Sequence, residues 1–168
     1  MLAKVVSYGG NSVRYALEKE KAKTVKVNNM PDGLDPTAIW YMMKHHCQYH
    51  QAERTVGRKL ERFMTTFVLS PSKEESANFT MEDWANLQDE ALEVLDSVGL
   101  NPKGFTNEVK TNFTNTMNVG GLHSDSKSGT LHLHIDCCRV DMEVLVTLIS
   151  LKITNCLLLD FHISFVYG

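Results

Sequence analysis

Two short segments decide the fold of this chain, Gly121-Leu122-His123-Ser124-Asp125 and Leu131-His132-Leu133-His134-Ile135-Asp136. In the second segment aliphatic residues alternate with histidine and aspartate, and alternate residues of a β-strand face the same side of a sheet. The residues between the segments are rich in the turn formers serine, aspartate and glycine. The pattern therefore predicts a β-hairpin in which His123 ends the first strand and residues 131–136 form the second.

The three histidines of this hairpin form a candidate metal site. His132 and His134 share one strand face, and the hairpin turn brings His123 beside them. Three imidazoles on one sheet surface suit a divalent metal ion with open coordination positions. The alternative interpretation is a hydrated sheet face without ligands. Imidazole binds several transition metals, so the pattern does not identify the ion.

Helix and strand patterns in the rest of the chain predict an α+β fold. Strands are expected over residues 2–8, 24–28 and 62–69, and helices from Ser12 and over residues 36–52 and 81–98. Asp35, before a proline, and Thr80, three residues before Asp83, are typical of helix N-caps. We expect the helices to pack on one face of a mostly antiparallel sheet, with the histidines on the other face.

Composition sets the broad class of the protein. The 168 residues suffice for one domain, with 43% hydrophobic and 22% charged residues as in ordinary globular proteins. A net charge of −3 gives no overall basic bias, although local patches matter more for nucleic-acid binding than the sum. The four cysteines lack zinc-finger spacing and are expected to be reduced. With no export signal at the N-terminus, we expect a cytoplasmic protein.

A second, weaker metal candidate lies in the helix expected over residues 36–52. His46 and His50 are four residues apart, with His45 and Cys47 adjacent. The helix lacks the glutamate beside the first histidine that a zinc-protease helix carries, which favours a solvated polar face. The chain continues with a basic cluster that suits a solvated helix end or contacts with DNA phosphates, Arg54, Arg58, Lys59 and Arg62.

The histidine hairpin resembles the third motif of plasmid-mobilisation relaxases, the relaxase/mobilisation nucleases of the His-hydrophobic-His endonuclease class. That motif reads His-x-Asp, a short loop, Pro-His-x-His, and then Asn-Arg-Val-Asp. This chain has His123-x-Asp125, His132-x-His134 and Arg139-Val140-Asp141. Leu131 and Cys138 stand where the family usually has proline and asparagine, and the loop is longer than the commonest form.

Two earlier motifs extend the resemblance to residues 1–141. In the family, a first strand leads to a short helix with a nucleophilic tyrosine, which matches Tyr15, and Tyr8 is the second choice. A serine at the end of a later strand contacts DNA there, which matches Ser70, and Arg14 is expected to contact DNA as well. Asp125 is expected to orient a ligand histidine, or to serve as a turn residue.

The resemblance implies a DNA relaxase. Tyr15 would nick single-stranded DNA at a transfer origin and form a 5′-phosphotyrosyl link, with a divalent metal held by His123, His132 and His134. Magnesium or manganese is the expected ion, and zinc, nickel and cobalt also fit. Mobilisation accessory proteins and a coupling protein are the implied further partners. The alternatives are an inactive relaxase remnant that acts as a DNA-binding module, and a replication initiator of the same nuclease class.

The last segment, residues 142–168, differs in composition from the rest. Residues 144–153 form a continuous apolar run, and residues 159–167 alternate between apolar and polar, as strands do. Lys152, Asp160 and His162 argue against a membrane span. Two interpretations stay open: the segment supplies sheet strands, or it is an out-of-frame terminus that leaves the relaxase-like domain truncated. The abrupt end of the resemblance favours the second.

Overall fold

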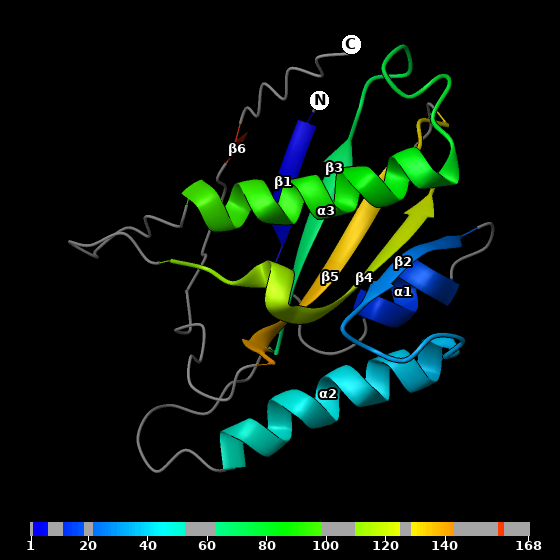
Figure 1. Cartoon of the computed structure of the whole chain (residues 1–168). Coiled ribbons are helices and arrows are strands. Elements are labelled where there is room, and N and C mark those ends of the chain that lie inside the picture. Colours follow the sequence, from blue (N-terminus) through cyan, green and yellow to red (C-terminus); the bar gives the residue numbers. More distant parts are fainter. Residues whose placement is uncertain are drawn as a thin grey trace.

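A computed structural model of the chain describes residues 2–6, 12–18, 22–52, 63–98, 110–124, 129–142 and 158–159. The helices and strands follow one another in the order that the sequence predicts (Figure 1). The elements are β1 (Leu2–Val6), α1 (Ser12–Glu18), β2 (Lys23–Asn28), α2 (Pro36–Ala52), β3 (Met64–Ser70), α3 (Met81–Val98), the 3-10 helix η1 (Phe113–Asn115), β4 (Thr116–His123), β5 (His132–Asp141) and β6 (Leu158–Leu159).

The strands form one sheet in the order β2-β4-β5-β3-β1-β6, and every neighbouring pair is antiparallel. The predicted hairpin is its β4–β5 pair, in which His123 lies opposite His132 and Gly121 opposite His134. β3 lies on the other side of β5, with Val68 opposite His134. The predicted α+β fold with an antiparallel sheet is therefore confirmed, and the hairpin lies inside the sheet, where neighbouring strands hold its register.

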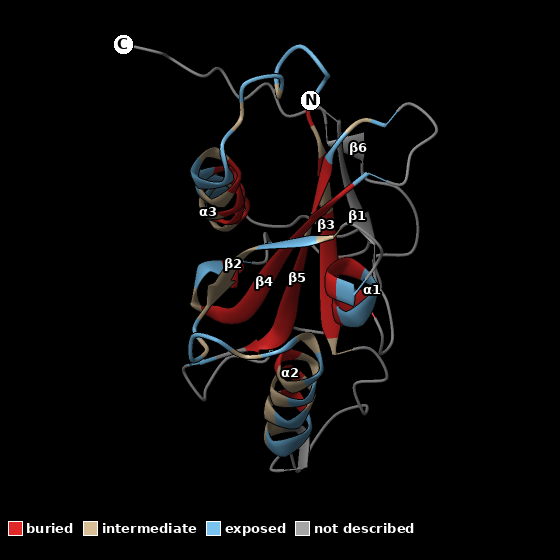
Figure 2. Cartoon of the chain, turned by 90° about the vertical axis from the view of Figure 1, so that its right-hand side faces the viewer, coloured by how far each residue is buried: buried red, intermediate tan, exposed pale blue. Residues whose placement is uncertain are grey.

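The prediction that the helices share one face of the sheet is wrong. α3 covers one face, where Trp84 and Leu87 pack with Ile135, whereas α1 and α2 cover the other, where Val13 and Ile39 pack with Val119 (Figure 2). The physical reason is that the central strands are apolar on both faces. Two adjacent residues of β5 show it: Cys137 belongs to the α3 side of the core and Cys138 to the α1 and α2 side. Both faces need a cover that removes them from water.

Both long helices have the bounds that the sequence predicts, and their N-caps explain why. The Ala38 amide donates to Asp35 Oδ1 at 2.9 Å at the start of α2. At the start of α3, the Asp83 amide donates to Thr80 Oγ1 at 3.2 Å, and the Thr80 amide donates back to the Asp83 carboxylate at 2.7 Å. Each cap satisfies amides that have no partner within the helix.

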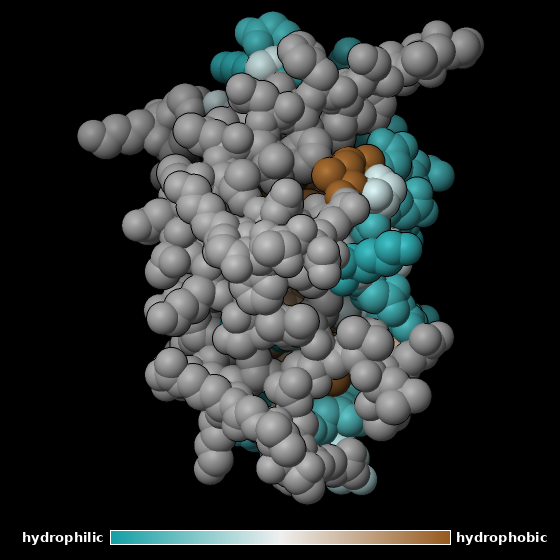
Figure 3. Space-filling model, turned by 90° about the vertical axis from the view of Figure 1, so that its left-hand side faces the viewer, coloured by the Kyte–Doolittle hydropathy of each residue, from teal (hydrophilic) through white to brown (hydrophobic). Residues whose placement is uncertain are grey.

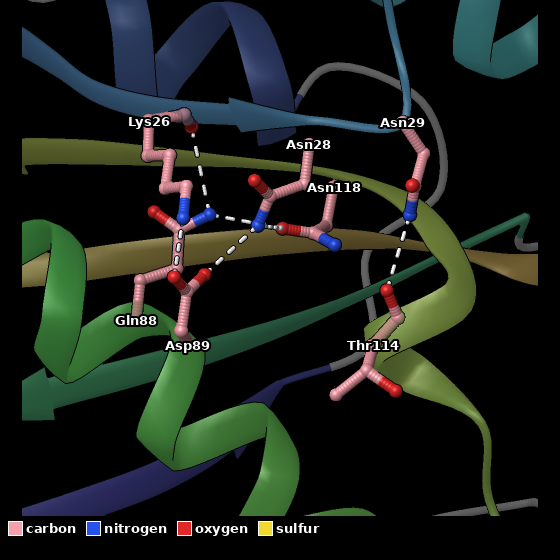
Figure 4. Close-up of polar contacts among 7 residues, drawn as sticks. All are labelled: Lys26, Asn28, Asn29, Gln88, Asp89, Thr114 and Asn118. Atoms are coloured by element: carbon pink, nitrogen blue, oxygen red, sulfur yellow. Dashed lines mark hydrogen bonds and ion pairs between the residues drawn. The ribbon is translucent and has the colours of Figure 1, made fainter.

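A polar network fastens α3 to the edge of the sheet (Figure 4). Asn118 of β4 accepts hydrogen bonds from Gln88 Nε2 at 2.9 Å and from Asn28 Nδ2 at 3.1 Å. Asn28 also donates to Asp89 at 3.0 Å, and Lys26 pairs with the same carboxylate. Gln88 and Asn118 are fully buried. Buried amides need partners at fixed positions, so this network sets where α3 lies on the sheet.

Two residues of the C-terminal segment, Leu158 and Leu159, are described by the structure. Leu158 pairs with Lys4 and Leu159 with Ala3, which adds β6 as a short antiparallel strand beside β1. The strand predicted over residues 144–153 and all but the first residue of the strand pattern over 159–167 lie outside the described residues, as does the choice between a sheet-forming and an out-of-frame tail. Within the described ranges, no helix combines the length and the apolar character that crossing a membrane requires.

Candidate metal centre

The three histidines come together where β4 ends and β5 begins. His123 is the last residue of β4 and His132 the first of β5, and the two are direct cross-strand partners. His134 lies two residues further along β5, so its side chain is on the same face as that of His132. The register of one antiparallel hairpin therefore determines which three imidazoles meet.

The distances among these rings fit a shared ion. The ring centroid of His123 lies 4.5 Å from that of His132 and 4.4 Å from that of His134. The centroids of His132 and His134 are 5.2 Å apart. One ring nitrogen from each residue lies within 4.8 Å of the other two. Nitrogens that bind one ion at about 2.1 Å lie roughly 3 to 3.5 Å apart, a separation that small ring rotations reach. Among the described residues, this is the one group of three or more metal-binding side chains so placed.

The burial of the histidines and one contact of His132 both suit metal binding. His123 and His132 are buried, and His134 is partly exposed. The Nδ1 atom of His132 lies 3.3 Å from the carbonyl oxygen of Thr130. A carbonyl only accepts hydrogen bonds, so this contact favours the tautomer with its proton on Nδ1, which leaves the Nε2 lone pair for a metal. His134 is thus the member of the group that solvent reaches.

Tyr15 of α1 lies over the same site. Its ring centroid is 5.6 Å from that of His123 and 5.9 Å from that of His134, and the side chain remains 48% exposed. The structure thus places the predicted nucleophile beside two of the three predicted ligands. Tyr8, the second choice, lies outside the described residues.

A glycine lets α1 come this close to the sheet. A Cβ atom at Gly121 would lie 2.5 Å from the carbonyl oxygen of Ala16, which is backbone and cannot move aside by itself. Gly121 is also the cross-strand partner of His134. Sequence reasoning did not single out this role, although a glycine inside a strand often marks the close approach of another backbone.

Asp136 is a buried carboxyl on the same strand face. Burial raises its pKa to about 6, against the opposing effect of hydrogen bonds from Thr66 and Ser12. The hydrogen bond from Thr66 Oγ1 to Asp136 Oδ1 ties β5 to β3.

The other predicted site residues have different surroundings. Ser70 ends β3 on the strand face of the histidines, at the sheet end where His132 lies. Arg14 is exposed, and its Nε forms an ion pair with Glu18 at 2.9 Å, so binding a phosphate would exchange one anion for another. Asp125 lies outside the described residues, as does the basic cluster within residues 53–62.

The weaker metal candidate on α2 is incomplete. The rings of His46 and His50 are adjacent, with centroids 4.6 Å apart. Among the residues that the structure describes, they do not belong to a group of three metal-binding side chains. The hairpin histidines are therefore the better metal candidate.

No protein-family model, curated protein or solved structure matches the chain. The functional interpretation therefore depends on the arrangement of the site residues themselves.

Proposed function

We propose that this chain is a metal-dependent DNA relaxase that nicks one strand of DNA at a transfer origin through Tyr15. One observation carries the proposal: an exposed tyrosine lies within 6 Å, between ring centroids, of two histidines in a group of three that can share a metal ion. A metal site alone fits many functions. A phenol beside the site adds a nucleophile, which is what a transesterification requires.

The proposed reaction conserves the number of phosphate ester bonds. The Tyr15 hydroxyl oxygen attacks the scissile phosphorus and loses its proton to a base. The bond from phosphorus to the 3′ oxygen breaks, and that oxygen takes up a proton as it leaves. The products are a 5′-phosphotyrosyl DNA and a free 3′-hydroxyl. Because one ester replaces another, attack by the 3′-hydroxyl rejoins the strand without a nucleotide cofactor.

His123, His132 and His134 would hold the divalent metal, which is manganese or magnesium in this proposal. When bound, the ion supplies positive charge for the non-bridging oxygens of the phosphate. His134 is partly exposed and Tyr15 is exposed, so in this proposal a single strand contacts the site at these two residues. Arg14 and Ser70 are the proposed contacts for flanking phosphates.

The experiment is a covalent capture assay. The protein is incubated with manganese and labelled single-stranded DNA, both candidate transfer origins and a randomised library, and is then denatured and separated on a gel. We expect a protein–DNA adduct that disappears with EDTA and with Tyr15→Phe. Tyr41→Phe is the matched control, because Tyr41 is 49% exposed on the neighbouring helix and lies outside the histidine group.

Each outcome of this assay has a distinct meaning. An adduct that survives Tyr15→Phe and disappears with Tyr8→Phe would assign the nucleophile to Tyr8. A folded wild-type protein that binds single-stranded DNA and forms no adduct would contradict the enzyme proposal and favour the inactive DNA-binding module. In the proposed system, accessory mobilisation proteins and a coupling protein would present the origin as a single strand.

A further inference from the structure

We infer that the outer side of α2 is a surface on which the bases of single-stranded DNA stack next to the proposed nicking site. This inference rests on the proposed function, because it concerns the strand that the proposed nuclease would cut. The surface consists of Tyr41, His45 and Tyr49, and we refer to it as the α2 aromatic face. The three residues are spaced four apart, so they follow one side of the helix.

All three side chains of the α2 aromatic face are accessible. Tyr41 and Tyr49 are 49% and 64% exposed, and His45 is exposed as well. The rings of Tyr41 and His45 have centroids 6.2 Å apart and planes within 25° of each other, so they present aligned flat faces. Successive rings are about 6 Å apart along the helix axis. Exposed aromatic rings spaced along one side of a helix suit stacked bases without a preference for sequence.

The α2 side and the α3 side of the molecule differ in charge. The segment Pro36–Ala52 contains no carboxylate, and its basic residues are one lysine and three histidines. α3, on the other face of the sheet, contains no lysine or arginine and carries the acidic residues Glu82, Asp83, Asp89, Glu90, Glu93 and Asp96. A polyanion is therefore repelled from the α3 side and directed to the α2 side.

One face of the molecule shows the hydropathy of its described surface. On the face shown in Figure 3, the described surface is largely hydrophilic, with a small hydrophobic area. The segment that forms α2 has no carboxylate and carries two exposed tyrosines, Tyr41 and Tyr49. A nucleic acid strand has both aromatic bases, which can stack on the rings, and phosphates, which favour a surface without carboxylates.

The α2 aromatic face is continuous with the candidate metal centre. The Thr37 hydroxyl of α2 donates to Glu18 of α1 at 3.3 Å, so the two helices meet at this point (Figure 1). The pKa of Arg14, the neighbour of Tyr15, is raised mainly by Glu18, with a smaller coulombic contribution from Tyr41. A strand that leaves the site above Tyr15 would pass Arg14 and reach Tyr41 first, then His45 and Tyr49.

Binding without catalysis tests the surface. The probe is a fluorescently labelled mixed-sequence single strand of about 16 nucleotides, in EDTA, with Tyr15→Phe as the reference protein. We expect the added double change Tyr41→Ala and Tyr49→Ala to weaken binding by about tenfold or more. The double change Tyr41→Phe and Tyr49→Phe keeps the rings and should keep the affinity. Met81→Ala, an exposed residue on α3, should have no effect.

Trp40 provides an independent signal on the same helix. Its ring centroid is 4.7 Å from that of Tyr41, whereas the other tryptophan, Trp84, is buried on the α3 side. Binding of the single strand should quench tryptophan fluorescence, and Trp40→Phe should remove most of that change while Kd stays nearly the same. Thermal melting of each variant establishes that it is folded.

Binding of the single strand to α2 and adduct formation at Tyr15 are measured separately, so either can fail alone. Equal binding by the alanine and phenylalanine double variants, equal affinity for a duplex of the same sequence, or no binding of the single strand would overturn the stacking surface. None of these results depends on adduct formation. A surface that passes the test in a protein that forms no adduct would leave the inference in place and remove the enzyme proposal.

Discussion

The ring of Tyr15 lies edge-on to the imidazole of His123, with centroids 5.6 Å apart and planes at 87°. The two residues come from different elements, α1 and the end of β4, and are more than 100 positions apart in the chain. An exposed phenol and a buried imidazole in contact combine a reactive group that a substrate can reach with a ligand held rigidly in the sheet. This relationship is the basis of the proposed chemistry.

Loss of one hairpin histidine should weaken metal binding. His134 is the partly exposed member of the group, so His134→Ala disturbs the core least. We expect its affinity for manganese or cobalt to fall by at least about tenfold, because removing even an outer partner of a ligand costs that much. Isothermal titration calorimetry on metal-free protein measures the change. His45→Ala, an exposed histidine on α2, is the control, and equal losses in both variants would argue against the hairpin site.

A side chain at position 121 should move Tyr15. In Gly121→Ala the new Cβ would meet the carbonyl oxygen of Ala16 at 2.5 Å, so α1 has to shift away from the sheet. We expect a loss of about 1–3 kcal/mol in the free energy of unfolding and a large drop in adduct formation. Chemical denaturation and the capture assay measure the two effects.

Gly120→Ala is the matched control for Gly121→Ala. A Cβ at Gly120 points to the other face and would lie 2.0 Å from Gln88 Oε1, the end of a side chain on α3. This change should also lower stability but should leave α1 in place. If the two variants lose adduct formation in proportion to their lost stability, Gly121 has no special part in positioning Tyr15.

The buried amide network should contribute more to the free energy of unfolding than the ion pair at its edge. Asn118→Ala leaves the donors of Gln88 and Asn28 without their acceptor, and we expect the free energy of unfolding to fall by about 2–4 kcal/mol. Lys26→Met removes the pair with Asp89, whose two side chains are 38% and 36% exposed, and should cost less than about 1 kcal/mol. Urea denaturation of both variants gives the comparison. A larger loss in Lys26→Met would contradict this order.

The N-cap of α3 should make a pH-dependent contribution to stability. Hydrogen bonds from the Thr80 hydroxyl and amide lower the pKa of Asp83, so the folded state favours the carboxylate. The contribution is then fully present above the unfolded pKa, near 3.9, and is lost as the pH falls through the lower folded value. Thr80→Ala should lower Tm by about 2 to 4 °C at pH 7.

The difference in Tm between wild type and Thr80→Ala should shrink as the pH falls below about 4. Differential scanning calorimetry at a series of pH values measures it. Ser97→Ala, at the other end of α3, is the control, since its hydroxyl donates to the Val94 carbonyl and involves no titrating group. A constant difference at every pH would mean that the cap acts through the threonine alone.

The sequence alone determined the local structure and the identity of the candidate ligands. Caps at Asp35 and Thr80 are local signals, because a helix start depends on a side chain within three residues of it. The alternation around His132 and His134 likewise indicates one strand face, because a strand turns successive side chains to opposite sides. These features need no knowledge of the rest of the chain.

Tertiary structure alone decided what lies beside the histidines and which face the helices cover. The strands are apolar on both sides, and the sequence does not state which helix packs on which face. That choice depends on contacts between distant segments, such as Ala16 against Gly121, and it places α1 and α2 on the histidine side. The position of Tyr15 over His123 and the exposed rings of α2 follow from this packing, because long-range burial, rather than local pattern, determines how helices dock on a sheet.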